Sequence, residues 1–291
     1  MARNVTQLHL NTTVHQVEFD GDSFTLATSQ GRVTADFVIV TASLGVLKHG
    51  SIAFVPELPK KLRHAIRKMN CDVSDKTVLQ FPEGSSKSWN GTALDVFYHI
   101  DQEPQHHGEF TENWNMAHYA QRDMLMSFSV GSRDWALLES SNSTSQSIGK
   151  EALMALRSAY PDLPEPLRVV SHKWGLDPYA ACTWSSWGVG SSPKDTKAFL
   201  EGVHGGKLLF AGEHATKSHP GTTHGAWNTG LSAAKAIDVA IARGSLTPDQ
   251  SVNLRTKIHT PRPQDVLRRR PFRSKRKEWG RQQRQQKQTW G

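Results

Sequence analysis

The sequence predicts a mixed α/β fold, and three observations lead to this prediction. Residues 37–42 (FVIVTA) form a continuous apolar run, which is typical of a strand buried on both faces. Residues 207–242 begin with a short apolar run, pass through a loop, and continue with apolar residues at helical spacing. Amphipathic helices are expected at residues 58–69 and 145–160, among stretches with strand-like patterns.

Length and composition describe an ordinary folded chain. Its 291 residues are enough for one large or two modest domains with a hydrophobic core. No apolar run reaches the length of a membrane span, and the N-terminus lacks the apolar core of a signal peptide. Two cysteines, Cys71 and Cys182, are too few for a disulfide framework. A cytoplasmic location is the default, and a secreted origin stays open because of four N-x-S/T sequons, at Asn4, Asn11, Asn90 and Asn142.

The formal net charge of +8 is unevenly distributed along the chain. Residues 245–291 contain 13 Lys/Arg against 3 Asp/Glu, a balance of +10, so residues 1–244 carry a balance of −2. A body near neutrality argues against a nucleic-acid-binding domain. The basic tail is expected to be disordered, and it is the one part for which nucleic acid is a candidate partner.

The remaining elements follow from local patterns. Residues 1–50 are expected to form strands, with a turn at Gly21–Asp22. Further strands are expected at residues 93–100, 124–130 and 168–174. The two amphipathic helices present one apolar face each, made of Leu58, Leu62, Ile66 and Met69 in the first and of Ile148, Leu153 and Leu156 in the second.

A polar stretch at residues 99–118 contains four histidines, namely His99, His106, His107 and His118. Adjacent histidines in a polar loop rarely chelate one ion, and no carboxylate or cysteine stands at ligand spacing beside them. We therefore expect no metal site.

The strand–turn–helix at residues 207–242 is the first candidate site. Ala211-Gly212 allows a sharp turn directly before Glu213, and Thr222 and Thr223 open the helix. A helix N-terminus offers unpaired N–H groups and the positive end of the helix dipole. From these properties alone, both an ordinary βα unit and a site for a flat or anionic ligand stay open.

The segment FAGEHATKSHPGTTHGAWNTG resembles the closing motif of the flavin-containing amine oxidases, in particular the plant and fungal polyamine oxidases. The resemblance implies that Gly212 and Glu213 hold the ribityl–pyrophosphate region of FAD. It also implies that the helix start at Thr222 and Thr223 faces the pyrimidine side of the flavin.

A second segment, FVIVTASLGVLKHGSIAFVPELP, resembles the part of this family that leads out of the FAD domain. Ser43 replaces a family proline, and this departure is expected to loosen the turn. The same alignment places Val14 where the family contacts the adenine ring. Simple strand core is an equally good interpretation of Val14.

Lys76 is the candidate catalytic residue. It matches a family lysine that holds a water molecule against flavin N5, in the segment CDVSDKTVLQF. A buried lysine at that place could have a lowered pKa and anchor water or accept a proton. Without the resemblance, a lysine at a strand start is usually a solvated surface residue.

The segment WGLDPYAACTWSSWGVG also resembles the family. Trp174 falls where the family stacks a tryptophan near the cofactor, and Trp184 and Trp187 fall on an aromatic cage that favours an amine through cation–π contact. The alternative is that these tryptophans are core. Cys182 lies one position before the cysteine through which monoamine oxidases attach FAD, so we expect non-covalent FAD.

The family architecture implies an α/β fold with an α+β substrate domain. A split, Rossmann-like FAD-binding domain would comprise residues 1–50 and 206–244, and an inserted mixed-sheet substrate-binding domain would comprise residues 51–205. The basic tail would be residues 245–291. The family's G-x-G-x-x-G loop does not occur in these 291 residues, so the FAD-binding domain is expected to be partial.

Two functions remain open. The first is an FAD-dependent amine (polyamine) oxidase, truncated relative to its family, which passes a hydride from the amine to flavin N5 and is reoxidised by O2 to give H2O2. Its partners would be a small amine and O2, with no membrane. The second is a non-catalytic remnant or truncated gene product that acts at most as a binding module.

Overall fold

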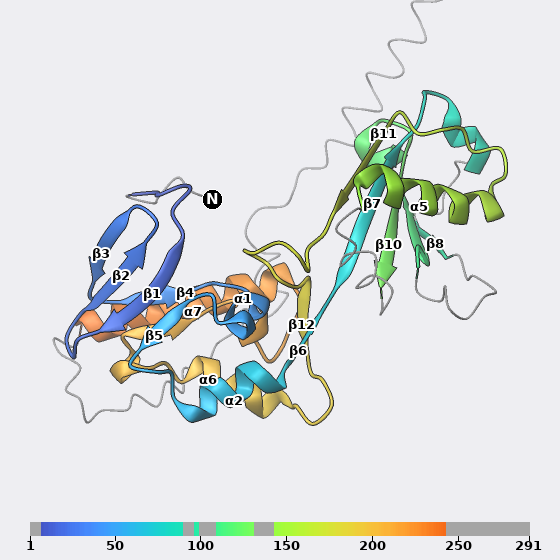
Figure 1. Cartoon of the computed structure of the whole chain (residues 1–291). Coiled ribbons are helices and arrows are strands. Elements are labelled where there is room, and N and C mark those ends of the chain that lie inside the picture. Colours follow the sequence, from blue (N-terminus) through green and yellow to red (C-terminus); the bar gives the residue numbers. More distant parts are fainter. Residues whose placement is uncertain (1–6, 90–95, 99–108, 131–142, 243–291) are drawn as a thin grey trace, which may run out of the picture. The chain divides into compact units, whose positions relative to one another are not determined.

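The computed structural model describes residues 7–89, 96–98, 109–130 and 143–242 (Figure 1). Helices and strands are mixed along this part of the chain, and the strands form four separate sheets. The α/β prediction is therefore confirmed at this level. Outside the described residues lie the tail after residue 242, the sequons at Asn4, Asn90 and Asn142, and the side chains of His99, His106, His107 and His118.

The first sheet is a meander with one added strand. Strands β1 (Val14–Phe19), β2 (Phe24–Thr28) and β3 (Gly31–Ala35) pair in antiparallel fashion, and β5 (Ala53–Val55) joins β1 in parallel. The predicted turn lies between β1 and β2, where the Asp20 carboxylate accepts hydrogen bonds from the backbone N–H groups of Asp22 and Ser23.

A two-stranded parallel sheet joins two segments that lie far apart in the chain. Strand β4 (Val38–Val40) pairs with β13 (Leu208–Phe210), and all three residues of β13 are buried. Among the described residues no further strand joins this sheet. Parallel strands are normally embedded in larger sheets, so both outer edges of this pair are unusual.

Residues 1–50 do not end in a strand. A short helix, α1 (Leu44–His49), follows β4, and the strand prediction is wrong at this point. Ser43 caps the helix, since its Oγ accepts a hydrogen bond from the Val46 N–H and donates one to the Ala180 carbonyl at 2.5 Å. Ser43 therefore fixes the turn that it was expected to loosen.

Helix α2 (Lys60–Lys68) confirms the first amphipathic prediction. Leu58, Leu62, Ile66 and Met69 are all buried in one hydrophobic cluster. Helix α6 (Pro193–Leu200) contributes Ala198 and Phe199 to the same cluster.

A five-stranded antiparallel sheet carries the second cluster. Its order is β11 (Arg168–His172), β7 (Ser74–Gln80), β10 (Met124–Val130), β9 (Glu112–Asn115) and β8 (Val96–Tyr98). Helix α5 (Ser145–Ala159) lies against β11 and β7 (Figure 1) and buries Ile148, Leu153 and Leu156, as predicted. Two shorter helical elements in this part are η2 (Ser85–Trp89) and α3 (Ala117–Ala120).

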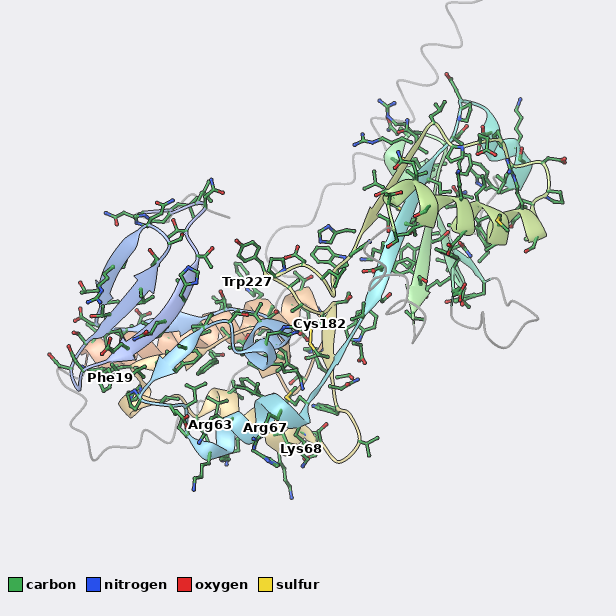
Figure 2. The ribbon with its side chains drawn as sticks, in the orientation of Figure 1. Phe19, Arg63, Arg67, Lys68, Cys182 and Trp227 are labelled. Atoms are coloured by element: carbon green, nitrogen blue, oxygen red, sulfur yellow. A yellow bond between two sulfur atoms is a disulfide. The ribbon has the colours of Figure 1, made fainter. Side chains whose placement is uncertain are left out.

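Strands β6 (Asn70–Asp72) and β12 (Trp184–Ser186) form a small sheet reinforced by a disulfide. Cys71 in β6 is bonded to Cys182, two residues before β12, and 111 residues separate them along the chain (Figure 2). The expectation of no disulfide framework therefore needs correction, because the two cysteines do form one bridge. The five-stranded sheet lies within the loop that this bridge closes.

Helix α7 (Thr223–Ala242) follows two short 3-10 elements, η4 (His204–Gly206) and η5 (Glu213–Ala215). Only Gly225, Thr229 and Ala233 are buried among its residues. Trp227, labelled in Figure 2, and Leu231 are 54% and 44% exposed. No helix in the described part of the chain is long and apolar enough to cross a membrane.

Candidate functional site

The candidate site is a hollow of about 350 Å³ beside β12 and the loop that leads to α7. Its lining comprises Trp184, Ser185, Ser186, Trp187, Pro220 and Gly221. These residues come from two segments that the sequence resemblance had singled out separately. The fold therefore brings the aromatic candidates and the Glu213 loop to one place.

Glu213 ties the two segments together. Its carboxylate accepts hydrogen bonds from the Ser185 N–H at 3.1 Å, the Ser185 hydroxyl at 2.7 Å and the Gly221 N–H at 2.8 Å. Hydrogen bonds to a carboxylate are about twice as strong as neutral ones. The side chain of Glu213 therefore holds β12 and the Pro220-Gly221 loop around the hollow.

Gly212 makes the turn between β13 and Glu213. Its φ of 155° lies in a region that residues with a side chain rarely adopt, and an added Cβ would lie 2.5 Å from the His214 ring. The backbone N–H of Gly212 donates to the Thr229 hydroxyl, and that hydroxyl donates back to the Gly212 carbonyl, each at 3.0 Å. The turn is thereby fixed to the body of α7.

Thr222 caps α7. Its hydroxyl accepts a hydrogen bond from the Gly225 N–H at 3.1 Å and donates one to the His219 carbonyl at 2.7 Å. Thr223 is exposed, and the first N–H groups of a helix have no partner within the helix. The N–H groups at the start of α7 can therefore donate hydrogen bonds to a ligand next to Gly221.

His214 follows Glu213 in the chain, and its side chain is buried. Its side chain is 1% exposed and lies edge-on to the Phe199 ring, with 5.0 Å between the ring centres. Within the described residues its Nε2 has no hydrogen-bond partner. Burial lowers the pKa of His214 to about 4, so the imidazole is neutral at physiological pH.

Trp184 and Trp187 form the aromatic part of the hollow, 36% and 40% exposed. The indole Nε1 of Trp187 donates to the Thr196 hydroxyl at 3.4 Å, which links this ring to α6. Neither tryptophan belongs to a hydrophobic cluster of the described chain. These observations favour a surface position for the two tryptophans over the interpretation that they belong to the core.

Lys76 and Trp174 lie in a different neighbourhood, at the start of β7 and after β11. The Lys76 side chain is exposed, and its Nζ lies 5.4 Å from the centre of the Phe128 ring. The Trp174 N–H donates to the Asp75 carboxylate at 3.0 Å, and burial raises the pKa of Asp75. No hydrogen bond among the described residues joins Lys76 or Trp174 to Glu213.

Thr183 connects the two neighbourhoods. Its hydroxyl accepts a hydrogen bond from the Ser74 N–H and donates one to the Ser74 carbonyl, both at 2.9 Å. Because Thr183 directly precedes Trp184, this pair of bonds ties the start of β7 to the aromatic part of the hollow.

Val14 lies apart from these groups. It is half-buried at the start of β1 and packs against the first hydrophobic cluster. That placement fits the strand-core interpretation, and it leaves a contact with the adenine ring untested.

The described residues contain no group of three or more His, Cys, Asp or Glu side chains that could hold a metal ion. The sequence analysis did not name Ser185, although its hydroxyl and its N–H both donate to the Glu213 carboxylate. Ser185 is 28 residues from Glu213 in the chain, and no local pattern indicates such a pairing.

Comparison with known proteins supplies the family. The sequence profile described as "Flavin containing amine oxidoreductase" matches residues 2–238. "Lysine-specific histone demethylase 1 homolog 3" of Oryza sativa subsp. japonica is 33% identical over 242 residues, which are 81% of this chain and 29% of that protein. "Protein FLOWERING LOCUS D" of Arabidopsis thaliana is 33% identical over 251 residues, 84% of this chain and 30% of that protein.

Solved structures share the fold. Wild-type putrescine oxidase bound to putrescine superposes with a TM-score of 0.64 at 18% identity, over 80% of this chain and 49% of that one. Cyclohexylamine oxidase from Brevibacterium oxydans IH-35A gives 0.59 at 22% identity, over 79% and 49%. The chain thus spans about half the length of these structures and less than a third of the curated relatives.

Proposed function

Because the chain belongs to the flavin containing amine oxidoreductases, we propose that it binds FAD non-covalently and serves in the oxidation of an amine. The observation that carries this proposal is the Glu213 carboxylate, which holds the helix-start loop and the two tryptophans around one hollow. The engagement of Cys182 in a disulfide supports non-covalent binding, since its sulfur has no free valence for a flavin.

The residues present fit one end of FAD. The start of α7 offers N–H donors and the positive end of a helix dipole, which suit the polar edge of a flavin. Gly221 has no atom closer than 3.8 Å to an added Cβ, so a flat group can approach its backbone. The pyrophosphate would normally need a glycine-rich loop, and this sequence contains none. We therefore assign Gly212, Glu213, Thr222 and Thr223 to the flavin and ribityl end.

When bound, FAD would accept a hydride from the amine and pass the electrons to O2, with H2O2 as product. Trp184 and Trp187 would orient the amine, because an aromatic face attracts an alkylammonium group. Lys76 would hold a water molecule, and Trp174 would pack beside the cofactor. The exposed position of Lys76 allows that role only where bound FAD covers its side chain.

The domain assignment stays a proposal. Residues 1–50 and 206–244 would form the FAD-binding part, and residues 51–205 the substrate-binding part. The parallel pairing of β4 with β13 and the separate hydrophobic cluster of the five-stranded sheet support this division.

We propose a polyamine as the substrate. The names of the histone demethylase, the putrescine oxidase and the cyclohexylamine oxidase refer to lysine, putrescine and cyclohexylamine, and all of these are amines. Among the described residues that line it, the hollow presents two tryptophan rings and no carboxylate, so it would recognise the cation through aromatic faces. A methylated lysine side chain is the competing substrate of the same chemistry.

A non-catalytic binding module is the second candidate. Two observations favour it, namely the exposure of Lys76 and the absence of G-x-G-x-x-G. In that case the hollow would bind an amine without oxidising it.

Binding and chemistry can be tested separately. The full chain is desalted after incubation with FAD, and flavin absorbance that stays with the protein is expected. Glu213→Gln should weaken FAD binding at least tenfold, whereas Glu83→Gln, at an exposed turn, should not. A chain that never retains flavin would contradict the first proposal and leave the binding module.

If flavin is retained, anaerobic addition of spermidine should bleach its absorbance. Bleaching by a methylated lysine peptide and not by spermidine would replace the polyamine proposal. Retained flavin that no amine bleaches would support the non-catalytic alternative.

A further inference from the structure

A second hollow, of about 650 Å³, lies between α2 and α6, and we call it the basic groove. Its ionised lining consists of five cations and one carboxylate, which are Lys60, Lys61, Arg63, Arg67, Lys194 and Asp195. His64, Ala65 and Ala198 complete the lining. The near-neutral charge of residues 1–244 conceals this local concentration of positive charge.

The amphipathic pattern of α2 builds one wall of the basic groove. Because Leu62, Ala65 and Ile66 are buried, the opposite face carries Lys60, Arg63, His64 and Arg67 at positions i, i+3, i+4 and i+7. Seven helical residues span roughly 10 Å along the axis. Arg63 and Arg67 can be followed along α2 in Figure 2.

Ion pairs within the described chain neutralise only some of the cations of the basic groove. Lys61 pairs with Glu201 at 2.6 Å and Arg63 with Glu57 at 2.8 Å, both with exposed side chains. Such exposed pairs contribute little and exchange readily with other anions. Within the described chain, Lys60, Arg67 and Lys194 have no carboxylate within ion-pair distance.

We propose that the basic groove binds the phosphate backbone of a nucleic acid without reading its sequence. A row of Lys and Arg side chains matches a chain with one negative charge at each short repeat. Arginine in particular suits phosphate, because its guanidinium can donate two parallel hydrogen bonds. This site is independent of the proposed oxidation chemistry, since none of its residues lines the hollow beside Glu213.

The lining favours a nucleic acid over other polyanions. Of the described residues that line it, Ala65 and Ala198 alone are apolar, and both are buried. Binding of a peptide normally uses apolar anchors, and binding of a membrane surface uses large exposed apolar side chains beside the basic ones. The groove offers charge alone, which suffices for non-specific binding to nucleic acid.

The test compares two triple variants of the full chain. Lys60→Gln/Arg67→Gln/Lys194→Gln removes the unpaired cations of the groove. Lys87→Gln/Arg122→Gln/Arg168→Gln removes three exposed cations around the five-stranded sheet and keeps the same net charge and the same tail. Affinity for a mixed-sequence DNA duplex is measured by fluorescence anisotropy at several salt concentrations.

We expect the groove variant to lose at least tenfold in affinity and to lower the slope of log K against log salt by about 2 to 3, since each phosphate contact contributes about 0.9. The control variant should retain both values. Equal losses in the two variants, or no loss in the groove variant, would overturn the proposal and assign DNA binding to the tail or to net charge.

The same proteins are assayed with phosphatidylserine/phosphatidylcholine vesicles and with poly-glutamate. A groove variant that loses vesicle or poly-glutamate binding while keeping its DNA affinity would also overturn the proposal. Conservative exchange, Lys60→Arg/Arg67→Lys/Lys194→Arg, should restore DNA binding and thereby excludes misfolding as the cause of the loss.

Discussion

His214 makes the stability of the chain depend on pH. Burial lowers its pKa to about 4 in the folded state, whereas the unfolded chain takes up this proton near pH 6.5. Between these values the unfolded state binds more protons, so the free energy of unfolding falls as the pH drops from 6.5 to 4. The loss that His214 causes by pH 4 is on the order of 3 kcal/mol.

Urea unfolding at pH 7, 6 and 5 measures this effect. His214→Gln should flatten the pH dependence, because glutamine does not titrate. His219→Gln is the matched control, since His219 is exposed in the same loop and should keep the wild-type slope. If His214→Gln kept the full pH dependence, other groups would be responsible.

Replacement of two glycines of α7 by alanine is expected to change the stability of the chain in opposite directions. At Gly225 an added Cβ would lie 2.1 Å from the His219 carbonyl oxygen, so the loop that carries Gly221 must shift. At Gly230 nothing lies within 4 Å. Gly225→Ala should therefore destabilise the chain by about 1–3 kcal/mol through overpacking, and Gly230→Ala should stabilise it by about 0.5–1 kcal/mol through helix propensity.

Thermal unfolding of the two variants checks this pair. Gly225→Ala should also weaken FAD retention, because it displaces the Glu213-bound loop. A Gly225→Ala variant as stable as the wild type would show that His219 and its loop move aside without cost.

The disulfide bond between Cys71 and Cys182 links β6 to the segment directly before β12. It closes a loop of 111 residues, and long loops give a cross-link its largest effect on the unfolded state. Replacing both cysteines by serine should lower the free energy of unfolding by about 2–4 kcal/mol. A reducing agent should destabilise the wild type by the same amount and leave the double variant unchanged. Equal stability of oxidised and reduced wild type would contradict this account.

Sequence patterns located most elements but not the contacts among them. Helix α2 could be predicted because four apolar residues share one face, and β10 because its residues form an uninterrupted strand-like run. Helix α6 was missed, although Ser192 and Asp195 form a capping box that a search for S-x-x-D would have found. The disulfide and the Ser185–Glu213 bonds join residues far apart in the chain, and no local pattern encodes such distances.

Only some residues of the candidate site could be selected from the sequence, again because local patterns do not encode contacts between distant segments. The resemblance selected Trp184, Trp187 and Glu213, and the structure brings the segments that carry them to one hollow. It also selected Lys76 and Trp174, which lie in a neighbourhood of their own. The identity of a side chain could be carried over from the family, but its environment could not, and Lys76 is exposed in the described structure.

At the scale of the whole molecule, the segments that contain β4, β13 and α7 leave surface exposed. Strands β4 and β13 form a two-stranded parallel sheet, and α7 buries only one narrow stripe. The chain spans about half of the solved structures with which it shares its fold.

This exposed surface leads to a prediction about association. Trp227 and Leu231 stand at positions i and i+4 of α7 and are exposed, and Ile241 near the end of the helix is exposed as well. Trp227 and Leu231 lie one helical turn apart, and neighbouring exposed apolar side chains on a surface helix promote contact with other molecules. We expect the chain to self-associate with rising concentration, and Trp227→Gln/Leu231→Gln to reduce this association with less than about 0.5 kcal/mol change in stability.

Ala233→Gln, at a buried position of the same helix, should instead lower stability without reducing association. Analytical ultracentrifugation and thermal unfolding of the three proteins distinguish these outcomes. If the double variant were as associated as the wild type, α7 would not be the surface through which the molecules meet.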